Sequence, residues 1–159
     1  MGEAVLRDIA KNRGLDIHVD SCGTGAYHVG EDPDDRTVAI CKKVRYEDAS
    51  HIAIRLMETL QHGVPISHKA RAISESDYKK FTHILAADGS NLRSLERFKP
   101  EDATAEVRLW GSYHNDDPIG DPYYGGINGF EKVYQQCVTF SSAFLDEVFG
   151  KSSDDKGDL

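Results

Sequence analysis

An acidic residue followed by a proline and two tyrosines is the strongest chemical signal in this sequence, in the run Asp-Pro-Tyr-Tyr-Gly at 121–125. A protonated Asp121 could deliver a proton to a leaving group and, once ionised, could activate a water molecule. The proline stiffens the loop and lowers the cost of ordering it, and the tyrosine rings offer flat surfaces to an aromatic group. Asp116 and Asp117 lie shortly before this run and are the alternative proton donors. By itself, Asp-Pro-Tyr is also typical of an ordinary turn.

The three cysteines are the other reactive side chains, and they lie far apart at Cys22, Cys41 and Cys137. Their number is odd, no Cys-x-x-Cys pair is present, and no histidine lies at zinc-binding spacing. This spacing argues against a disulfide framework and against a structural zinc site. We therefore expect reduced thiols, mostly buried.

Composition limits the classes of function. A length of 159 residues suits one domain, and a formal net charge of -8 argues against general binding to nucleic acid. The sequence has no apolar run long enough to cross a bilayer and no signal segment, which favours a cytoplasmic protein with no membrane contact.

Apolar spacing predicts strands that alternate with helices, which is typical of an α/β fold with a parallel sheet. We expect helices at 4–10 (closed by Gly14), at 32–43, after a Ser74–Asp77 capping box, at 90–99 and at 128–149 (stopped by Gly150), and strands at 17–21, 82–87 and 106–110. Parallel sheets bind ligands outside the carboxyl ends of their strands. At that edge Ser21, Asp88 and the segment after Trp110 would converge. The polar residues 151–159 are expected to form a disordered tail.

The chain from Gly2 to about Gly150 resembles the low-molecular-weight protein tyrosine phosphatases, in their fungal form. The resemblance rests on the first residues Met-Gly-Glu-Ala, on Cys-Lys-Lys at 41–43, on His-Gly-Val-Pro-Ile-Ser-His at 62–68 and on the run at 121–125. It implies a three-layer α/β fold around a four-stranded parallel sheet. It also implies a cytosolic acid phosphatase that hydrolyses phosphotyrosine proteins or small aryl phosphates through a phospho-cysteine, with no metal and no cofactor.

The resemblance also assigns roles around a substrate cleft. Asp121 matches the family's general acid and base, and Tyr123 and Tyr124 match the tyrosines that wall the cleft. Tyr27 matches an aromatic position at the rim of the cleft.

Three further residues match positions around the phosphate-binding loop. Ser21 and His68 correspond to a serine and a histidine that hydrogen-bond to that loop and hold its conformation. Asp88 corresponds to an aspartate at a strand end near the active site, and its alternative interpretation is a helix cap. Gly89 stands where the family usually has a glutamate.

The family's nucleophile loop has no counterpart in these residues. In the family a buried first strand leads into a Cys-x5-Arg loop, and Met1 falls just after that loop. The residues six positions after the three cysteines are His28, Glu47 and Ala143, so none is an arginine. We therefore expect a domain over 1–150 that lacks the first central strand and has no turnover. The unpaired strand edges predict a strand-exchanged oligomer or an aggregate.

Residues 44–61 interrupt the family pattern between Lys43 and His62. The codons that can encode Val44-Arg45, Leu56-Met57 and Gln61 fit a splice donor, a branch sequence and a splice acceptor. We interpret the segment as a retained in-frame intron, with a true insertion that forms a surface helix as the alternative.

Three functional interpretations remain open. The chain is a fragment or isoform of an active phosphatase, or a noncatalytic binding or regulatory isoform, or a relative of the arsenate reductases. The last is disfavoured because the cysteines form no redox pair.

Overall fold

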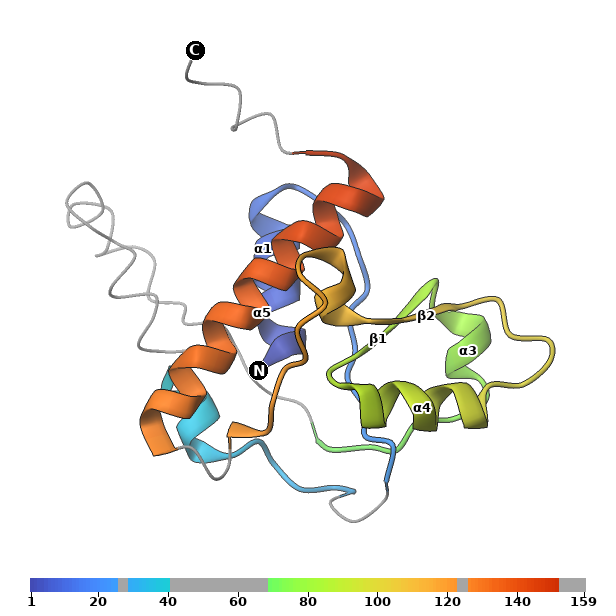
Figure 1. Cartoon of the computed structure of the whole chain (residues 1–159), viewed down its shortest axis with the longest axis horizontal. Helices are drawn as coiled ribbons and strands as arrows, with labels where there is room; N and C mark the ends of the chain where they lie inside the picture. The colour runs from blue at the N-terminus through green and yellow to red at the C-terminus, as the bar shows by residue number, and fades with distance from the viewer. Residues whose placement is uncertain (26–28, 41–68, 123–125, 152–159) are drawn as a thin grey trace.

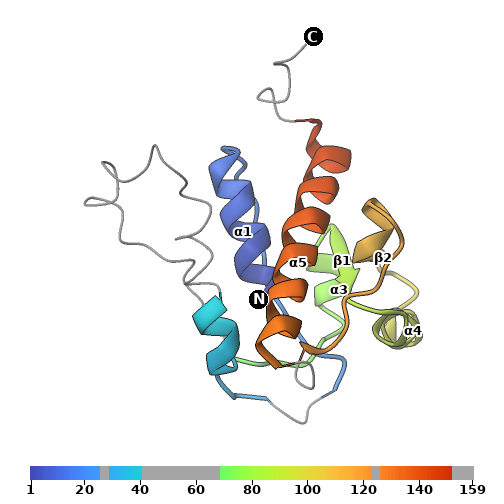
Figure 2. The same ribbon diagram turned by 60° about the vertical axis from the view of Figure 1, so that its left-hand side comes forward.

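The computed structural model describes residues 1–25, 29–40, 69–122 and 126–151. Two strands lie in the middle, the two long helices pack on one face, and shorter helices lie on the other (Figures 1 and 2). The elements are α1 (Gly2–Asn12), α3 (Asp77–Lys80), β1 (His83–Ala86), α4 (Gly89–Phe98), β2 (Glu106–Leu109), the 3-10 helix η2 (Trp110–Tyr113) and α5 (Gly126–Phe149). Residues 35–40 are also helical. The α/β architecture predicted from the alternation of strands and helices is therefore confirmed.

The two strands pair in parallel, with His83 opposite Glu106 and Ala86 opposite Leu109. Both strands were predicted. β1 ends two residues before Asp88, and β2 ends directly before Trp110. Alternate residues of β1 face two different cores, since Leu85 packs toward α1 and α5, whereas Ile84 and Ala86 pack beside α4. Because both faces of β1 are covered, it behaves as an interior strand.

The larger core lies between the two long helices. Its buried members include Val5, Leu6 and Ala10 of α1 together with Cys137, Phe140 and Leu145 of α5. Arg13 Nη1 reaches Asp146 Oδ1 at 2.6 Å and ties the end of α1 to α5. Gly14 and Gly150 follow these helices with φ of +69° and +88°, a conformation that glycine adopts without strain.

The smaller core lies on the other face of the sheet. Tyr78 is 1% exposed, and its hydroxyl donates to the carbonyl of Leu95 at 2.7 Å, while its own carbonyl accepts the N–H of Ala105. These bonds join α3, α4 and the approach to β2 into one layer.

One local prediction was wrong, and another is confirmed only in part. Residues 17–21 are not a strand, because no neighbouring strand pairs with them within the described chain; a single parallel bridge, between Gly23 and Ala72, follows instead. The capping box at Ser74 is half formed, since the Asp77 side chain accepts the N–H of Ser74 as the box requires. The Ser74 hydroxyl donates to Asp77 rather than capping the helix, and the N-cap of α3 is Ser76, without a side-chain bond.

Some predicted features fall outside the described residues. They include segment 44–61, the end of the helix predicted over 32–43, and 152–159 of the tail. In the part of the chain that the structure describes, no helix combines the length and the apolar character that crossing a bilayer requires.

Gly111 provides a test of the loop after β2. Its carbonyl accepts three N–H groups from residues 114–116, and a Cβ at this position would lie 1.9 Å from the carbonyl oxygen of Asp117. We expect Gly111→Ala to lower the free energy of unfolding by about 3 kcal/mol, because the loop must move apart to admit the methyl group. Urea unfolding followed by circular dichroism measures this change.

Gly120→Ala is the matched control, because no atom lies within 4 Å of a Cβ built there. We expect it to leave stability nearly unchanged. Equal stability of the two variants would contradict the tight loop closure.

Candidate functional site

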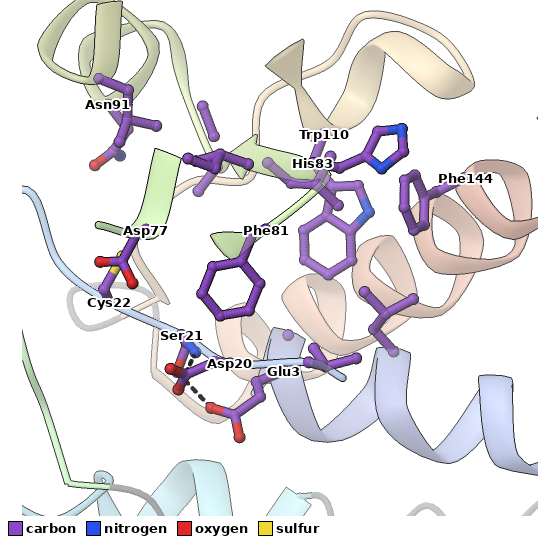
Figure 3. Close-up of a pocket in the computed structure, with 18 of the residues that line it drawn as sticks. Glu3, Asp20, Ser21, Cys22, Asp77, Phe81, His83, Asn91, Trp110 and Phe144 are labelled. Carbon is purple, nitrogen blue, oxygen red and sulfur yellow. Dashed lines mark hydrogen bonds between the residues drawn. The ribbon is translucent and has the colours of Figure 1, made fainter. Parts of the chain in front are cut away.

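A cavity of about 400 Å³ lies between α1, the extended segment 17–22, β1 and α5 (Figure 3). Most of its wall is apolar, from Leu6, Ile17, Val19, Leu85, Trp110 and Phe144. Three carboxylates, those of Glu3, Asp20 and Asp77, lie at one end together with Ser21 and Cys22 (Figure 3). At the other end lie His83, Trp110 and Phe144.

Ser21 lies at the polar end of this cavity. Its hydroxyl donates to Glu3 Oε2 at 2.6 Å, and its backbone N–H donates to Asp20 Oδ1 at 2.9 Å. Glu3 also forms an ion pair with Arg7, one helical turn further along α1. The start of α1 and the end of segment 17–21 are therefore joined by a serine-to-carboxylate bond.

Arg71 forms a charge network that sequence reasoning did not identify. Its guanidinium donates to Asp20 Oδ2 at 2.8 Å and 3.1 Å, and to Asp77 Oδ2 at 2.8 Å. The Asp77 side chain also accepts the N–H and the hydroxyl of Ser74. No spacing rule could have paired residues 20 and 71; the one hint was that Asp20 directly precedes Ser21, a residue already singled out.

The network changes the ionisation of its members. Burial alone would raise the pKa of Asp77, but hydrogen bonds from Arg71 and Ser74 outweigh burial and hold the pKa below its ordinary value. The hydrogen bond to Asp77 raises the pKa of Arg71. Asp77 and Arg71 are therefore both charged at neutral pH.

Cys22 lies beside this network and lines the cavity. Although it is exposed as a residue, loss of water around the sulfur raises the pKa of the thiol, and the Arg71 charge only partly opposes this. A thiol that stays protonated at neutral pH is a poor nucleophile.

Asp88 caps helix α4, since Asp88 Oδ1 accepts the N–H of Asn91 at 2.7 Å. The Asn91 side chain in turn lies 3.4 Å from the hydroxyl of Thr24. The carbonyl of Ala87 accepts the N–H of Ile119 at 2.8 Å, which brings the segment before Asp121 to the same strand end.

The three candidate acids lie on the loop that follows η2. Asp121 is exposed and precedes Pro122. Asp117 Oδ2 instead accepts the Asn115 amide at 2.6 Å, and Asp116 occupies a left-handed conformation with φ of +62°. None of the three lines the cavity. Four of the predicted site residues lie outside the described residues: Tyr27, His68, Tyr123 and Tyr124.

The described side chains include no cluster of three or more histidine, cysteine, aspartate or glutamate residues that could hold a metal ion.

The chain is similar to proteins of a known family. A family model described as "Low molecular weight phosphotyrosine protein phosphatase" matches residues 1–61 and 53–153. A protein of that name from Schizosaccharomyces pombe is 40% identical over 154 residues, which cover 93% of this chain and 87% of the relative. One from Homo sapiens is 37% identical over 157 residues, which cover 93% of this chain and 86% of the relative.

Solved structures give the same result. A protein tyrosine phosphatase from Entamoeba histolytica superimposes with a TM-score of 0.75 at 25% identity, over 92% of this chain and 86% of the other. A Drosophila arginine phosphatase superimposes with a TM-score of 0.72 at 31% identity, over 93% and 88%.

The charge network around Arg71 gives a second test. We expect Asp77→Asn to lower the free energy of unfolding by about 2 kcal/mol at pH 7, because it removes a nearly buried carboxylate from the guanidinium. Since the folded pKa of Asp77 lies below 3.8, this contribution is complete above that pH and is lost as the pH falls through the folded pKa. Urea unfolding across this pH range measures it.

Asp102→Asn is the matched control, since Asp102 pairs with Lys79 at 2.6 Å but remains exposed. We expect no measurable change, as is usual for exposed ion pairs. A loss as large as that in Asp77→Asn would show that burial does not govern the effect.

Proposed function

Because the chain belongs to the low molecular weight phosphotyrosine protein phosphatase family, we propose that its fold serves the hydrolysis of phosphotyrosine and of small aryl phosphates. The observation that carries this proposal is 40% identity across 93% of the chain with a relative of that name. We further propose that it acts in the cytoplasm on phosphoproteins, as an acid phosphatase without metal or cofactor.

Asp121 is the proposed general acid and base. Protonated, it gives its proton to the leaving phenolate oxygen; ionised, it activates the water that hydrolyses the phospho-cysteine. The bond between Ile119 and Ala87 supports this role, because it holds the preceding segment at the carboxyl end of β1. Tyr123, Tyr124 and Tyr27 are the proposed walls of the cleft around the aryl ring.

Ser21, His68 and Asp88 are the proposed supports of a phosphate-binding loop. The position of Ser21 beside Glu3, at the first turn of α1, supports this role, because free N–H groups at a helix start attract an anion. Asp88 contributes indirectly, by holding the start of α4.

The 159 residues contain no Cys-x5-Arg sequence, and the thiol nearest the site, Cys22, has a raised pKa. In-line attack on phosphorus needs a thiolate, and the transition state needs a guanidinium fork on its equatorial oxygens. We therefore propose that this chain by itself performs no turnover. The second candidate function, a noncatalytic binding protein, is favoured by the apolar cavity beside β1.

We also propose that residues 44–61 are additional to the family's domain. The family model matches this chain in two stretches, 1–61 and 53–153, that overlap at 53–61, and the change from one match to the other within segment 44–61 supports this proposal. A surface insertion is tolerable because the entropy cost of loop closure grows slowly with loop length.

The unmodified chain is expected to show no hydrolysis of p-nitrophenyl phosphate above the buffer rate. Fusing a strand and Cys-x5-Arg loop of the family's type ahead of Met1 should give turnover, because a thiolate and a guanidinium are then present. In that fusion, Asp121→Asn should lower kcat about 100-fold or more, whereas Asp117→Asn and Asp116→Asn should not. Steady-state kinetics measure this, with phosphoarginine as a parallel substrate. Robust hydrolysis by the unmodified chain, or an active fusion indifferent to Asp121→Asn, would refute the assignment.

The origin of residues 44–61 is tested on messenger RNA. We expect spliced transcripts to join the codon of Lys43 directly to that of His62, because codons that can encode Val44-Arg45, Leu56-Met57 and Gln61 fit splice signals. Sequencing of cDNA across this junction measures it. Transcripts that retain all eighteen codons in mature message would establish a true insertion instead.

A further inference from the structure

The segment that leads to Asp121 runs alongside α5, from η2 to the first turn of that helix (Figures 1 and 2). Two contacts with α5 hold it there. The side-chain amide of Gln136 donates to the carbonyl of Pro118, with 3.2 Å between Nε2 and the oxygen. A Cβ built on Gly129 would lie 3.4 Å from the carbonyl oxygen of Pro122, so the bare backbone of α5 passes close to the segment at that point.

Residues 118–122, which we call the acid loop, are also fixed to the sheet. The N–H of Ile119 donates to the carbonyl of Ala87, directly after β1, at 2.8 Å, and the Ile119 side chain is buried in the larger core. The carbonyl of Pro118 and the N–H of Ile119 belong to one peptide group. That group is therefore bonded to α5 on one side and to the end of β1 on the other, which fixes its orientation.

The acid loop has little slack between its two contacts with α5. Gln136 and Gly129 lie two helical turns apart, which is about 10 Å along the helix axis. Four residues of fully extended chain span at most about 14 Å. Both ends of the loop are prolines, whose rings fix φ and reduce the number of conformations that the loop can adopt. The loop therefore holds Asp121 within a narrow region beside the end of β1.

We propose that Gln136 positions the proton donor of the reaction, by fixing from α5 the peptide group from which the acid loop continues to Asp121. The proposal rests on the proposed function of Asp121, and Gln136 acts through the loop rather than on the substrate. Proton transfer requires a defined distance to the leaving oxygen, and a displacement of about 1 Å can cost about 100-fold in rate. Helix α5 is packed against α1 through the larger core, so it gives the loop a rigid support.

The first test measures the contact in the unmodified chain. Gln136→Leu keeps a side chain of similar size but removes the donor. We expect the amide of Ile119 to exchange with deuterium about tenfold faster in this variant, because the peptide group loses one of its two bonds. The amide of Ala105, which is bonded to Tyr78 in the smaller core, should exchange at its original rate. Hydrogen exchange followed by NMR measures both amides, and an unchanged rate at Ile119 overturns the proposal.

Gln135→Leu is the matched control for this test. Gln135 is the neighbouring residue of α5, is exposed, and lies with its amide 3.5 Å from Glu131 on the same helix. We expect both amides to exchange in this variant as they do in the unmodified chain. A rise at Ile119 as large as that in Gln136→Leu shows that the bond to Pro118 is not responsible, and overturns the proposal.

The second test uses the fusion that carries a Cys-x5-Arg loop, and it separates positioning from a general effect on structure. Phenolate needs a proton as it leaves, whereas dinitrophenolate is a weak base and needs none. We expect Gln136→Leu to lower kcat/KM for phenyl phosphate about tenfold and to leave kcat/KM for dinitrophenyl phosphate within about twofold. Gln135→Leu should change neither.

The outcomes of the second test are distinct. Equal losses on both substrates indicate a structural effect alone and overturn the positioning role. A fusion without turnover overturns the proposed function, and the positioning role falls with it. Exchange at Ile119 still decides in that case whether Gln136 holds the acid loop.

Discussion

The other elements of this molecule are arranged around the buried backbone of β1. A buried N–H or C=O group needs a hydrogen-bond partner, and β1 is covered on both faces by apolar side chains. One of its edges is satisfied by β2, whereas the other faces the cavity between β1 and segment 17–21. The helices α1 and α5 cover one face of the strand and α4 covers the other, so the positions of these helices follow from the burial of β1.

A network of charged side chains lies at one end of this cavity. Arg71 joins the end of segment 17–21 to the beginning of α3 through Asp20 and Asp77. Because a nearly buried carboxylate is stable only when its bonds are made, this network holds Ser21 against Glu3 and keeps the carboxyl ends of the extended segments together. The site that we propose for the family's catalytic chemistry lies at that edge, since loops at strand ends carry function while the sheet supplies rigidity.

Membership of the family is distinct from possession of the groups that catalyse its reaction. The relatives establish the fold and the class of reaction, because the helices, strands and connecting loops correspond over nearly the whole length. Competence depends on a few groups, among them a thiolate and a guanidinium on one loop. The described cysteines do not supply that thiolate, since the pKa of the Cys22 thiol is raised and Cys137 is buried in the core between α1 and α5.

The sequence alone determined the elements that depend on local physics. Helical spacing and terminal glycines predicted α1 and α5, and compact apolar runs predicted β1 and β2, because periodicity and backbone freedom act over a few residues. For the site, chain order predicted that Ser21 and Asp88 follow extended segments. The helix-cap interpretation of Asp88 is also local, because its bond runs to Asn91, three residues further on. Only the tertiary structure decided that Arg71 joins Asp20 to Asp77 and that residues 17–21 stay unpaired within the described chain. Those outcomes depend on contacts between segments up to about fifty residues apart, and the physical reason is that pairing a strand edge or burying a charge requires a partner that local sequence cannot name.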